Sequence, residues 1–354
     1  MKPFHRSLLL PLVALSAALY GLEAAAGPLY HIDSAVTLQG QSTPNWDYLA
    51  FNPATSLLYV SLRQDGALVY DTNAKKVVRT LDNTKGANAF ALLPEFDRGF
   101  VINQDGSATV FELATHKTLK RVKFAEEADN GFYDPATRQL LVTTGGAHEA
   151  VFLDPKTAEV LGRMRVDSSK LEGTAPDGKG NMFMALRDRN KVLRIDMKRR
   201  EVNAEWPTPG CEQPNGVAFD PASQRVFVAC RGRDPVLAVI NAEDGKVVTT
   251  VPIGRGSDVL VFDAEQHRLY SSNGVDANLT VVDQIDADTY KIAEVPTTRP
   301  YARTMALDPR TKTVYLVAAE GTVDPGKKWG SDVATYYPNT YFKDTFTVLS
   351  LQRR

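Results

Sequence analysis

Seven polar positions recur along the chain at near-constant spacing, and their side chains could bind a ligand or take part in a reaction. Each lies five or six residues before a turn that usually contains proline. The positions hold four carboxylates, two amides and one guanidinium: Asp47, Asn88, Asp129, Glu172, Asn215, Asp258 and Arg303. If the fold gathers these side chains in one place, they form a polar site for an unidentified small molecule or protein.

A second set of residues lies ten positions after each turn. Its members are Arg63, Gln104, Gly145, Arg187, Arg231, Gly274 and Ala319, which Glu320 follows. A hairpin that reverses at the turn places the two sets opposite each other. This register predicts three ion pairs: Asp47 with Arg63, Glu172 with Arg187, and Arg303 with Glu320. Cross-strand pairs of this kind are worth about 0.2–1 kcal/mol each, so a structural role is expected for them.

Asp129 and Asp258 differ from the other carboxylates because glycine stands opposite both of them. Neither glycine can neutralise the charge, so both carboxylates are predicted to be unpaired. Two such groups at one site favour a cation, an amine or a polyhydroxy compound as ligand.

The elements that must position these residues follow from an internal repeat. The turns are marked by Pro53, Pro94, Pro135, Asp177, Pro221, Ala264 and Pro309, at spacings of 41 to 45 residues. Each unit holds four short apolar runs separated by Asp-Pro, Asp-Gly or Asn-Gly, and leaves no room for a crossover helix. Seven units of this kind predict an all-β, seven-bladed β-propeller with four-stranded blades.

The boundaries of the blades follow from the same repeat. The predicted blades cover residues 44–81, 86–124, 127–166, 170–208, 210–253, 254–297 and 299–354, and residues 28–40 complete the last of them. The last unit provides only three strands, whereas an extra strand precedes the first unit. We therefore expect the N-terminal strand to become the outer strand of the last blade and to close the ring.

The first 26 residues are predicted to be a signal peptide, because a basic start and an apolar stretch precede the small residues 24–27. The expected mature chain, residues 27–354, is a single domain in the periplasm or outside the cell. Without the leader, 39 basic residues face 41 acidic ones, which disfavours binding to nucleic acid. No second apolar run is long enough to span a membrane, and we expect a monomer.

Several of these segments also resemble the YVTN-repeat β-propellers and, among them, the YncE-like exported proteins. The resemblance is carried by Gly210-Cys-Glu-Gln-Pro-Asn-Gly, Asp244-Gly-Lys-Val-Val, Arg303-Thr-Met-Ala-Leu-Asp-Pro and Thr345-Phe-Thr-Val-Leu. It implies an exported seven-bladed propeller and provides no catalytic residue. The chain departs from the family pattern at an aromatic-rich insertion, residues 321–344, which contains Trp329, Tyr336, Tyr337, Tyr341 and Phe342.

Cys211 and Cys230 are the only cysteines. A hairpin turning at Asp220-Pro221 would return Cys230 opposite about Asn215, on the same face as Cys211. In an exported chain, this arrangement predicts a disulfide.

The catalytic signatures of common hydrolases are absent, and the histidines are scattered. The sequence therefore favours a binding or scaffold protein over an enzyme. One enzymatic alternative remains, because Glu172-Gly with Asp177-Gly, Pro214-Asn215-Gly and Ser257-Asp258 resemble the metal-binding segments of lactonase-type propellers of the SMP-30 kind. In that hypothesis Glu172, Asn215 and Asp258 would hold a divalent cation that polarises a lactone carbonyl.

Overall fold

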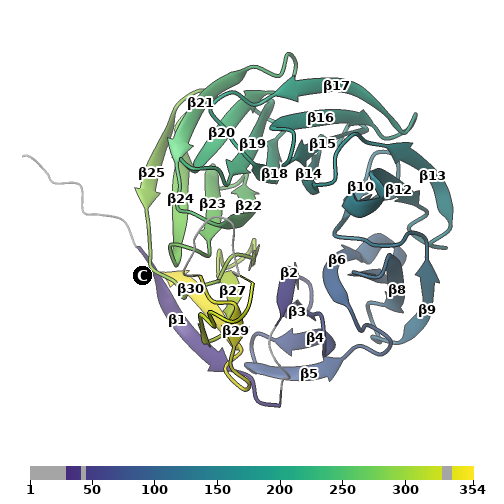
Figure 1. Cartoon of the computed structure of the whole chain (residues 1–354), viewed down its shortest axis with the longest axis vertical. Helices are drawn as coiled ribbons and strands as arrows, with labels where there is room; N and C mark the ends of the chain where they lie inside the picture. Colours follow the sequence, from purple (N-terminus) through teal and green to yellow (C-terminus); the bar gives the residue numbers. More distant parts are fainter. Residues whose placement is uncertain (1–28, 41–44, 329–336) are drawn as a thin grey trace, which may run out of the picture.

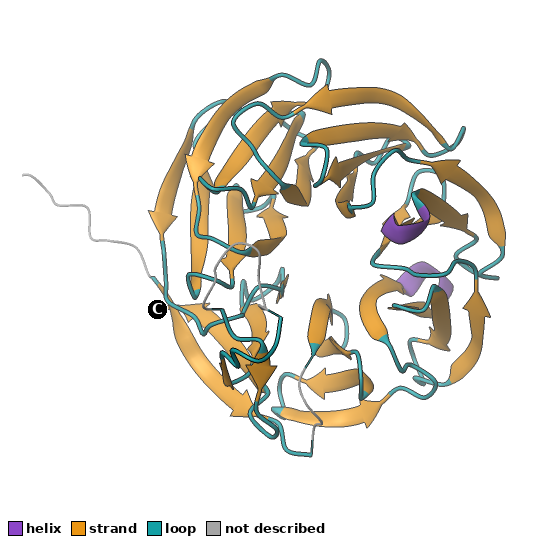
Figure 2. Cartoon of the chain, viewed as in Figure 1, coloured by secondary structure: helices purple, strands orange, loops and turns teal. Residues whose placement is uncertain are grey.

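Seven four-stranded antiparallel sheets stand around a central channel in the computed structural model (Figure 1). It describes residues 29–40, 45–328 and 337–354, and the predicted signal peptide lies outside these residues. Apart from two single-turn 3-10 helices, η1 (Pro94–Phe96) and η2 (Gly145–Ala147), the described elements are all strands (Figure 2). The predicted seven-bladed propeller is confirmed.

The strands of each blade follow one another from the channel outward. Blade 1 is β2 (Trp46–Asn52), β3 (Leu57–Leu62), β4 (Gly66–Asp71) and β5 (Lys76–Thr80); blade 2 is β6 (Ala87–Leu93), β7 (Arg98–Asn103), β8 (Ser107–Glu112) and β9 (Thr118–Lys123); blade 3 is β10 (Gly131–Asp134), β11 (Gln139–Thr144), β12 (Glu149–Leu153) and β13 (Val160–Arg165); blade 4 is β14 (Leu171–Pro176), β15 (Asn181–Leu186), β16 (Lys191–Asp196) and β17 (Glu201–Pro207).

The remaining blades repeat this order, with one exception in the last. Blade 5 is β18 (Pro214–Asp220), β19 (Arg225–Cys230), β20 (Val236–Asn241) and β21 (Val247–Pro252); blade 6 is β22 (Ser257–Asp263), β23 (Arg268–Asn273), β24 (Asn278–Gln284) and β25 (Tyr290–Glu294); blade 7 is β26 (Met305–Leu307), β27 (Val314–Ala318), β30 (Thr347–Arg353) and, outermost, β1 (Tyr30–Thr37).

The turn between the first two strands of a blade is fixed by its first residue. In blade 5 the Asp220 carboxylate accepts hydrogen bonds from the backbone N–H groups of Ala222 and Ser223, and in blade 3 Asp134 does the same for Ala136 and Thr137. A residue with positive φ then ends the turn: Ser56, Arg138, Gln224, His267 or Lys312 in blades 1, 3, 5, 6 and 7. The Asp-Pro repeat of the sequence is therefore a side-chain-capped turn.

The core is divided among the contacts between blades. The described residues form seven clusters of buried side chains, and each cluster joins two neighbouring blades around the whole ring. A blade buries both of its faces against neighbours, so its stability depends on an unbroken ring.

The ring is closed by β1, as predicted. Strand β1 pairs antiparallel with β30, from Tyr30 opposite Arg353 to Thr37 opposite Thr347. Tyr30 also reaches blade 6, because its backbone N–H donates to a Glu294 carboxylate oxygen at 2.7 Å and its hydroxyl lies 3.1 Å from that of Tyr270. The start of the described chain and the C-terminus therefore lie side by side at this seam (Figure 1).

The described residues include no helix that is long and apolar enough to cross a membrane.

Removing β1 tests the closure. Deleting residues 29–38 would expose the full hydrogen-bonding edge of β30 and the contacts of Tyr30 with blade 6, so we expect the melting temperature to fall by more than about 10 °C. The measurement is thermal unfolding followed by circular dichroism. Ile32→Thr, at a half-exposed position of the same strand, is the control and should change stability by less than about 0.5 kcal/mol. A deletion variant with the same melting temperature as the parent would contradict closure of the ring by β1.

Candidate functional site

A local irregularity orients five of the seven polar side chains. In β2 the pairing passes from Trp46–Leu62 to Leu49–Val60, so that Asp47 and Tyr48 form a bulge opposite one residue of β3. Strands β6, β14, β18 and β22 shift register at the same point. Bulges re-aim side chains, and here they place Asp47, Asn88, Glu172, Asn215 and Asp258 at equivalent positions around the ring.

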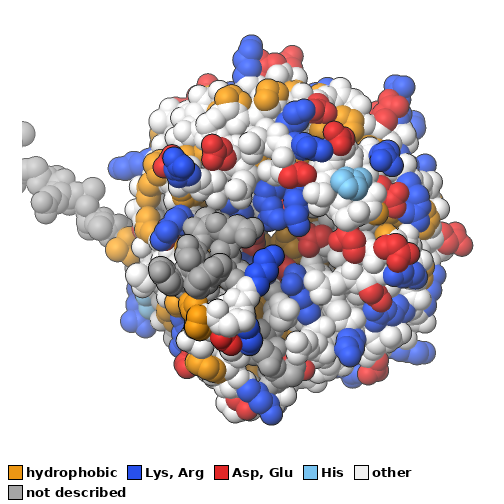
Figure 3. Space-filling model, in the orientation of Figure 1, with side chains coloured by type: hydrophobic (Ala, Val, Ile, Leu, Met, Phe, Trp, Pro, Cys, Tyr) orange, Lys and Arg blue, Asp and Glu red, His pale blue; other side chains and the backbone are white. Residues whose placement is uncertain are grey.

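Five of the seven side chains line a cavity of about 490 Å³ at the mouth of the channel: Asp47, Asp129, Glu172, Asp258 and Arg303. Asn88 and Asn215 are fully buried and are not part of its lining. Acidic and basic side chains gather around the central hollow of this face (Figure 3). Six of the seven predicted residues are at most 9% exposed, and Asp129 is half-buried. The lining is formed by Asp47, Tyr48, Arg63, Glu127, Asp129, Gly145, Ser169, Lys170, Leu171, Glu172, Arg187, Gln213, Arg231, Gly256, Asp258, Val275, Tyr301, Arg303, Lys328 and Tyr337.

Arginines that follow the second strand of a blade bridge to the next blade. Arg63 pairs with Asp47 in its own blade, and its Nε donates to Asn88 of blade 2 at 2.9 Å. Arg187 pairs with Glu172 at 3.2 Å and reaches Asn215 of blade 5 at 3.5 Å. The predicted pairs Asp47–Arg63 and Glu172–Arg187 are therefore present, and both arginines extend the contact across a blade boundary.

The two asparagines repeat a second kind of bridge. The Asn88 amide donates to the backbone carbonyl of Asp129 at 2.7 Å and to its carboxylate at 2.9 Å. The Asn215 amide donates to the same two groups of Asp258, at 3.0 and 3.3 Å. In each case an amide of one blade holds the aspartate of the next.

Arg303 closes this polar ring, and its predicted pairing with Glu320 is wrong. Its guanidinium lies between two other blades, 2.7 Å from Asp258 and 3.2 Å from Asp47. The prediction failed because it considered only the hairpin of blade 7, whereas the side chain points across the ring. The prediction that Asp258 is unpaired is also wrong, because its carboxylate binds both Arg303 and Arg231.

Asp129 is the carboxylate for which the expectation holds. No Lys, Arg or His nitrogen lies within ion-pairing distance of it among residues 29–40, 45–328 and 337–354, and Asn88 is its hydrogen-bond donor. Burial raises the pKa of Asp129 well above its ordinary value, and the charges of Glu172 and Asp47 raise it further. Asp258 shows the opposite behaviour, because Arg231 and Arg303 outweigh its burial and lower its pKa.

The three residues proposed to hold a divalent cation do not fit that role. Arg187 binds Glu172, two arginines bind Asp258, and Asn215 donates its amide to Asp258. Cationic guanidinium groups thus lie where a metal ion would have to bind. The Gly after Glu172 and Asn215 has a packing cause, since a Cβ on Gly173 or Gly216 would lie 2.7 Å from backbone atoms of the next blade.

Sequence reasoning missed Tyr48 and Tyr301 as lining residues. Tyr48 follows Asp47 in the bulge, and burial together with the charge of Asp129 raises its pKa well above the ordinary value. Tyr301 stacks under the Arg303 guanidinium at 4.6 Å. An aromatic residue next to a polar position is also common in ordinary strands, so neither tyrosine gave a signal in the sequence.

The described part of the 321–344 insertion packs onto the last blade. It forms the short hairpin β28 (Gly321–Thr322) and β29 (Thr340–Tyr341). Tyr337 donates to the Gly274 carbonyl at 2.7 Å, and Tyr341 contacts Trp46 edge-on at 5.3 Å. These two rings therefore serve in packing, and Tyr337 also lines the cavity, whereas Phe342 is 47% exposed. Trp329 and Tyr336 lie outside the described residues.

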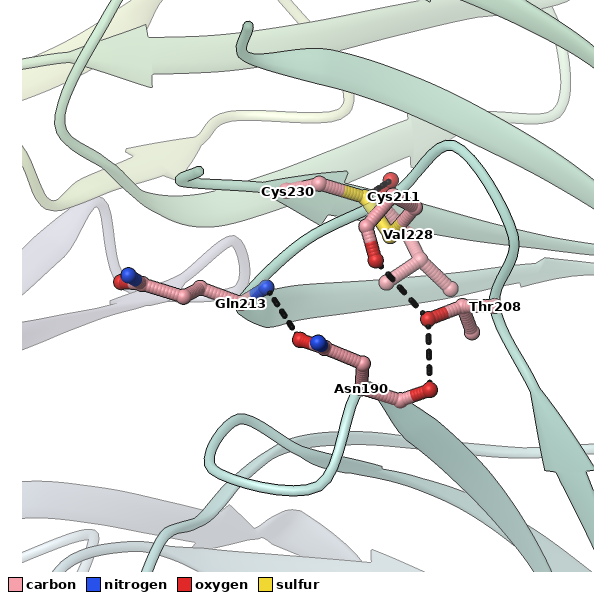
Figure 4. The surroundings of a disulfide bond; sticks show 6 residues. All are labelled: Asn190, Thr208, Cys211, Gln213, Val228 and Cys230. Carbon is pink, nitrogen blue, oxygen red and sulfur yellow. Dashed lines mark hydrogen bonds between the residues drawn. A yellow bond between two sulfur atoms is a disulfide. The ribbon is translucent and has the colours of Figure 1, made fainter. Parts of the chain in front are cut away.

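The predicted disulfide is present beside the channel. Cys211 and Cys230 are bonded, with their Cα atoms 5.3 Å apart, and both are buried (Figure 4). The bond joins the segment that precedes Gln213 to the end of β19, directly before Arg231. From blade 4, Asn190 accepts hydrogen bonds from the Gln213 N–H and the Thr208 hydroxyl. The disulfide thus anchors two lining residues of blade 5.

The disulfide should stabilise the protein by limiting the unfolded chain. Replacing both cysteines by alanine removes a cross-link between residues 19 positions apart, and we expect a loss of about 3 kcal/mol in the free energy of unfolding. Urea unfolding of the oxidised protein and the double variant measures the difference. A reductant should destabilise the parent and leave the variant unchanged; equal stability of variant and parent would contradict the prediction.

Asp129 and Asp258 should respond differently to the same substitution. Asp258→Asn removes the carboxylate that pairs with Arg231 and one of the two that pair with the buried Arg303, so we expect a loss of about 3 kcal/mol at pH 7. Asp129→Asn removes a carboxylate without a cationic partner and should keep or raise the melting temperature. Thermal unfolding of both variants checks this contrast, and equal losses would contradict it.

The pH dependence of the two variants has opposite signs. The raised pKa of Asp129 means that its ionisation costs stability as pH rises above about 4, so the advantage of Asp129→Asn should grow from pH 4 to pH 8. The lowered pKa of Asp258 means that its contribution is present above about pH 4 and is lost below it. The defect of Asp258→Asn should therefore shrink toward pH 3, as melting curves across this range would show.

Comparisons with known proteins agree with this architecture. No family model matches the chain. Proteins named "Uncharacterized protein YncE" from Salmonella typhi and Salmonella typhimurium are 24% identical over 191 residues, which cover 52% of this chain and 53% of theirs. The Escherichia coli O157:H7 protein of that name is 27% identical over 143 residues, 38% of this chain and 40% of its own. The chain thus aligns with about half the length of its curated relatives.

Two solved structures show the same fold at low sequence identity. A chain of the mitotic checkpoint complex superposes with a TM-score of 0.71 at 16% identity over 99% of both chains. Kuenenia stuttgartiensis hydrazine synthase superposes with a TM-score of 0.68 at 15% identity, over 88% of this chain and 97% of its own. The repeat and the ring make the chain a seven-bladed β-propeller, and its sequence is similar to that of the YncE proteins.

Proposed function

We propose that this protein is a non-enzymatic binding protein that holds a small polar ligand in the mouth of its channel. The observation that carries the proposal is the 490 Å³ cavity, which six of the seven blades line with polar side chains. A cavity of this size lies within the range that encloses small organic molecules. The polar lining favours a ligand with charged or hydrogen-bonding groups.

The rigidity of the lining supports binding as its task. The charged side chains of the mouth hold one another through ion pairs and amide hydrogen bonds that cross blade boundaries. Groups that are fixed before the ligand arrives lose little conformational entropy on binding. Such a ring recognises a complementary shape and charge, and the arginines that engage Glu172 and Asp258 support this function over metal-dependent hydrolysis.

The proposed place of action is the periplasm or the outside of the cell. Two features support it: the signal-peptide pattern of residues 1–26, and the disulfide, a bond that persists mainly in oxidising compartments.

Blocking the mouth without altering its charges tests the proposal. Val275 lines the cavity, so Val275→Trp should fill part of it with an indole. Val248→Trp, at an exposed position of the outer strand β21, is the matched control. Each protein is incubated with the fraction below about 1 kDa of a bacterial envelope extract, desalted, and examined by native mass spectrometry. We expect an adduct on the parent and on Val248→Trp, reduced at least tenfold on Val275→Trp.

Two outcomes would refute the binding function. One is the absence of any adduct on the parent protein. The other is equal retention by the blocked and control variants, which would place the ligand elsewhere on the molecule.

A further inference from the structure

The polar ring at the channel mouth is bridged at six of its seven blade boundaries. Side-chain contacts join blades 1 and 2, 2 and 3, 4 and 5, 5 and 6, 6 and 7, and 7 and 1. Between blades 3 and 4 the described residues of the ring make no such contact, although Arg200 and Gln139 join these blades farther from the mouth. Here Asp129 and Glu172, two carboxylates, are neighbours in the ring.

The missing contact corresponds to a missing arginine. In blades 1, 4 and 5 an arginine follows the second strand, and its guanidinium reaches a polar residue of the next blade. The equivalent residue of blade 3 is Gly145, where a Cβ would lie 2.5 Å from the backbone oxygen of Ser169. The path of the chain from blade 3 to blade 4 therefore excludes any side chain at this position.

The absence of that arginine leaves acceptor atoms free. Asp129 receives the Asn88 amide on Oδ1, and Glu172 meets Arg187 through Oε1. Neither Asp129 Oδ2 nor Glu172 Oε2 accepts a hydrogen bond from the residues that the structure describes. Both atoms remain accessible, since neither is among the fully buried unpaired polar atoms, and both residues line the cavity.

An aromatic ring completes the surroundings of these atoms. Tyr48 lines the same cavity. Burial is the main cause of the raised pKa of its hydroxyl, and the charges of Asp129, Asp47 and Glu172 raise this pKa further. Carboxylates beside an aromatic ring form a favourable environment for an organic cation, which gains charge-assisted hydrogen bonds and contact with the ring.

We propose that the ligand carries a guanidinium or ammonium group, which binds Asp129 and Glu172 at the place where the fold omits an arginine. This inference rests on the proposed binding function and specifies the chemical class of its ligand. An organic cation fits better than a metal ion, because no cluster of three or more His, Cys, Asp or Glu among the described residues could hold a metal. N–H donors are also what the ring itself supplies to its other carboxylates.

The test uses defined probes and titration calorimetry at low ionic strength. Agmatine, spermidine and L-arginine supply the proposed groups, whereas succinate, a neutral polyol and calcium chloride represent other ligand classes. At least one organic cation should bind with a Kd below about 1 mM. Asp129→Asn should weaken that binding at least tenfold, since one charge-assisted hydrogen bond is lost. Glu243→Gln, an exposed residue away from the channel mouth, makes the same change in charge and should leave binding unaltered.

A direct measurement on the parent protein guards against a folding defect in the variant. A crystal soaked with the tightest-binding cation should show its nitrogen within hydrogen-bonding distance of both Asp129 and Glu172. Thermal unfolding confirms that Asp129→Asn is folded, which we expect because asparagine occupies the equivalent positions 88 and 215.

The outcomes separate this inference from the proposed function. Binding of succinate, the polyol or calcium in the channel, with no binding of the three cations, would overturn the cationic ligand and leave the binding function standing. Cation binding that survives Asp129→Asn, or density elsewhere in the crystal, would also overturn it. A parent protein that acquires no adduct from the extract and binds none of the probes would refute both.

Discussion

The closeness of seven inner strands around one axis is the constraint on which the rest of the structure depends. Each blade places a polar side chain at or beside the mouth of the same narrow channel, partly removed from water, where an isolated charge is costly. The chain meets this cost by pairing groups from different blades. Arg303 shows it most clearly, because its guanidinium lies between the carboxylates of Asp47 and Asp258, one on each side of its own blade.

Pairing across blades makes the charged ring and the apolar core interdependent. Each of the seven core clusters lies between two blades, so the distance between neighbouring inner strands is set by apolar packing. The polar bridges need that distance within a few tenths of an ångström. Closure by β1 and the Cys211–Cys230 disulfide restrict the remaining freedom, the first at the seam of the ring and the second beside Arg231. A defect at the rim is therefore expected to reach the channel.

Local features could be predicted from the sequence, and features that depend on the closed ring could not. The strand repeat, the closure by residues 30–37, the disulfide, and the pairs Asp47–Arg63 and Glu172–Arg187 all follow from hairpins whose register the turn fixes. The partners of Arg303 and Asp258 belong to other blades, 27 to 256 residues away in sequence. Finding them requires the angle between blades, which no single repeat contains. The Gly after Glu172 and Asn215 was misleading for the same reason, since its cause is the approach of the next blade.

Asp129 and Asp258 occupy equivalent positions in the repeat but differ in their charged neighbours and in their pKa values. Both are aspartates at the same point of the repeat, both face a glycine, and both are held by an asparagine of the preceding blade. Asp258 has arginines from blades 5 and 7 beside it, and its pKa is lowered. Asp129 has Glu172 as its neighbour, and its pKa is raised. Elsewhere in the ring the carboxylates are paired with arginines, whereas the close approach of the chain at Gly145 leaves Asp129 without such a partner. The polar ring is bridged by side-chain contacts at six blade boundaries and lacks such a contact at the seventh. This exception points to a cationic group supplied by a ligand.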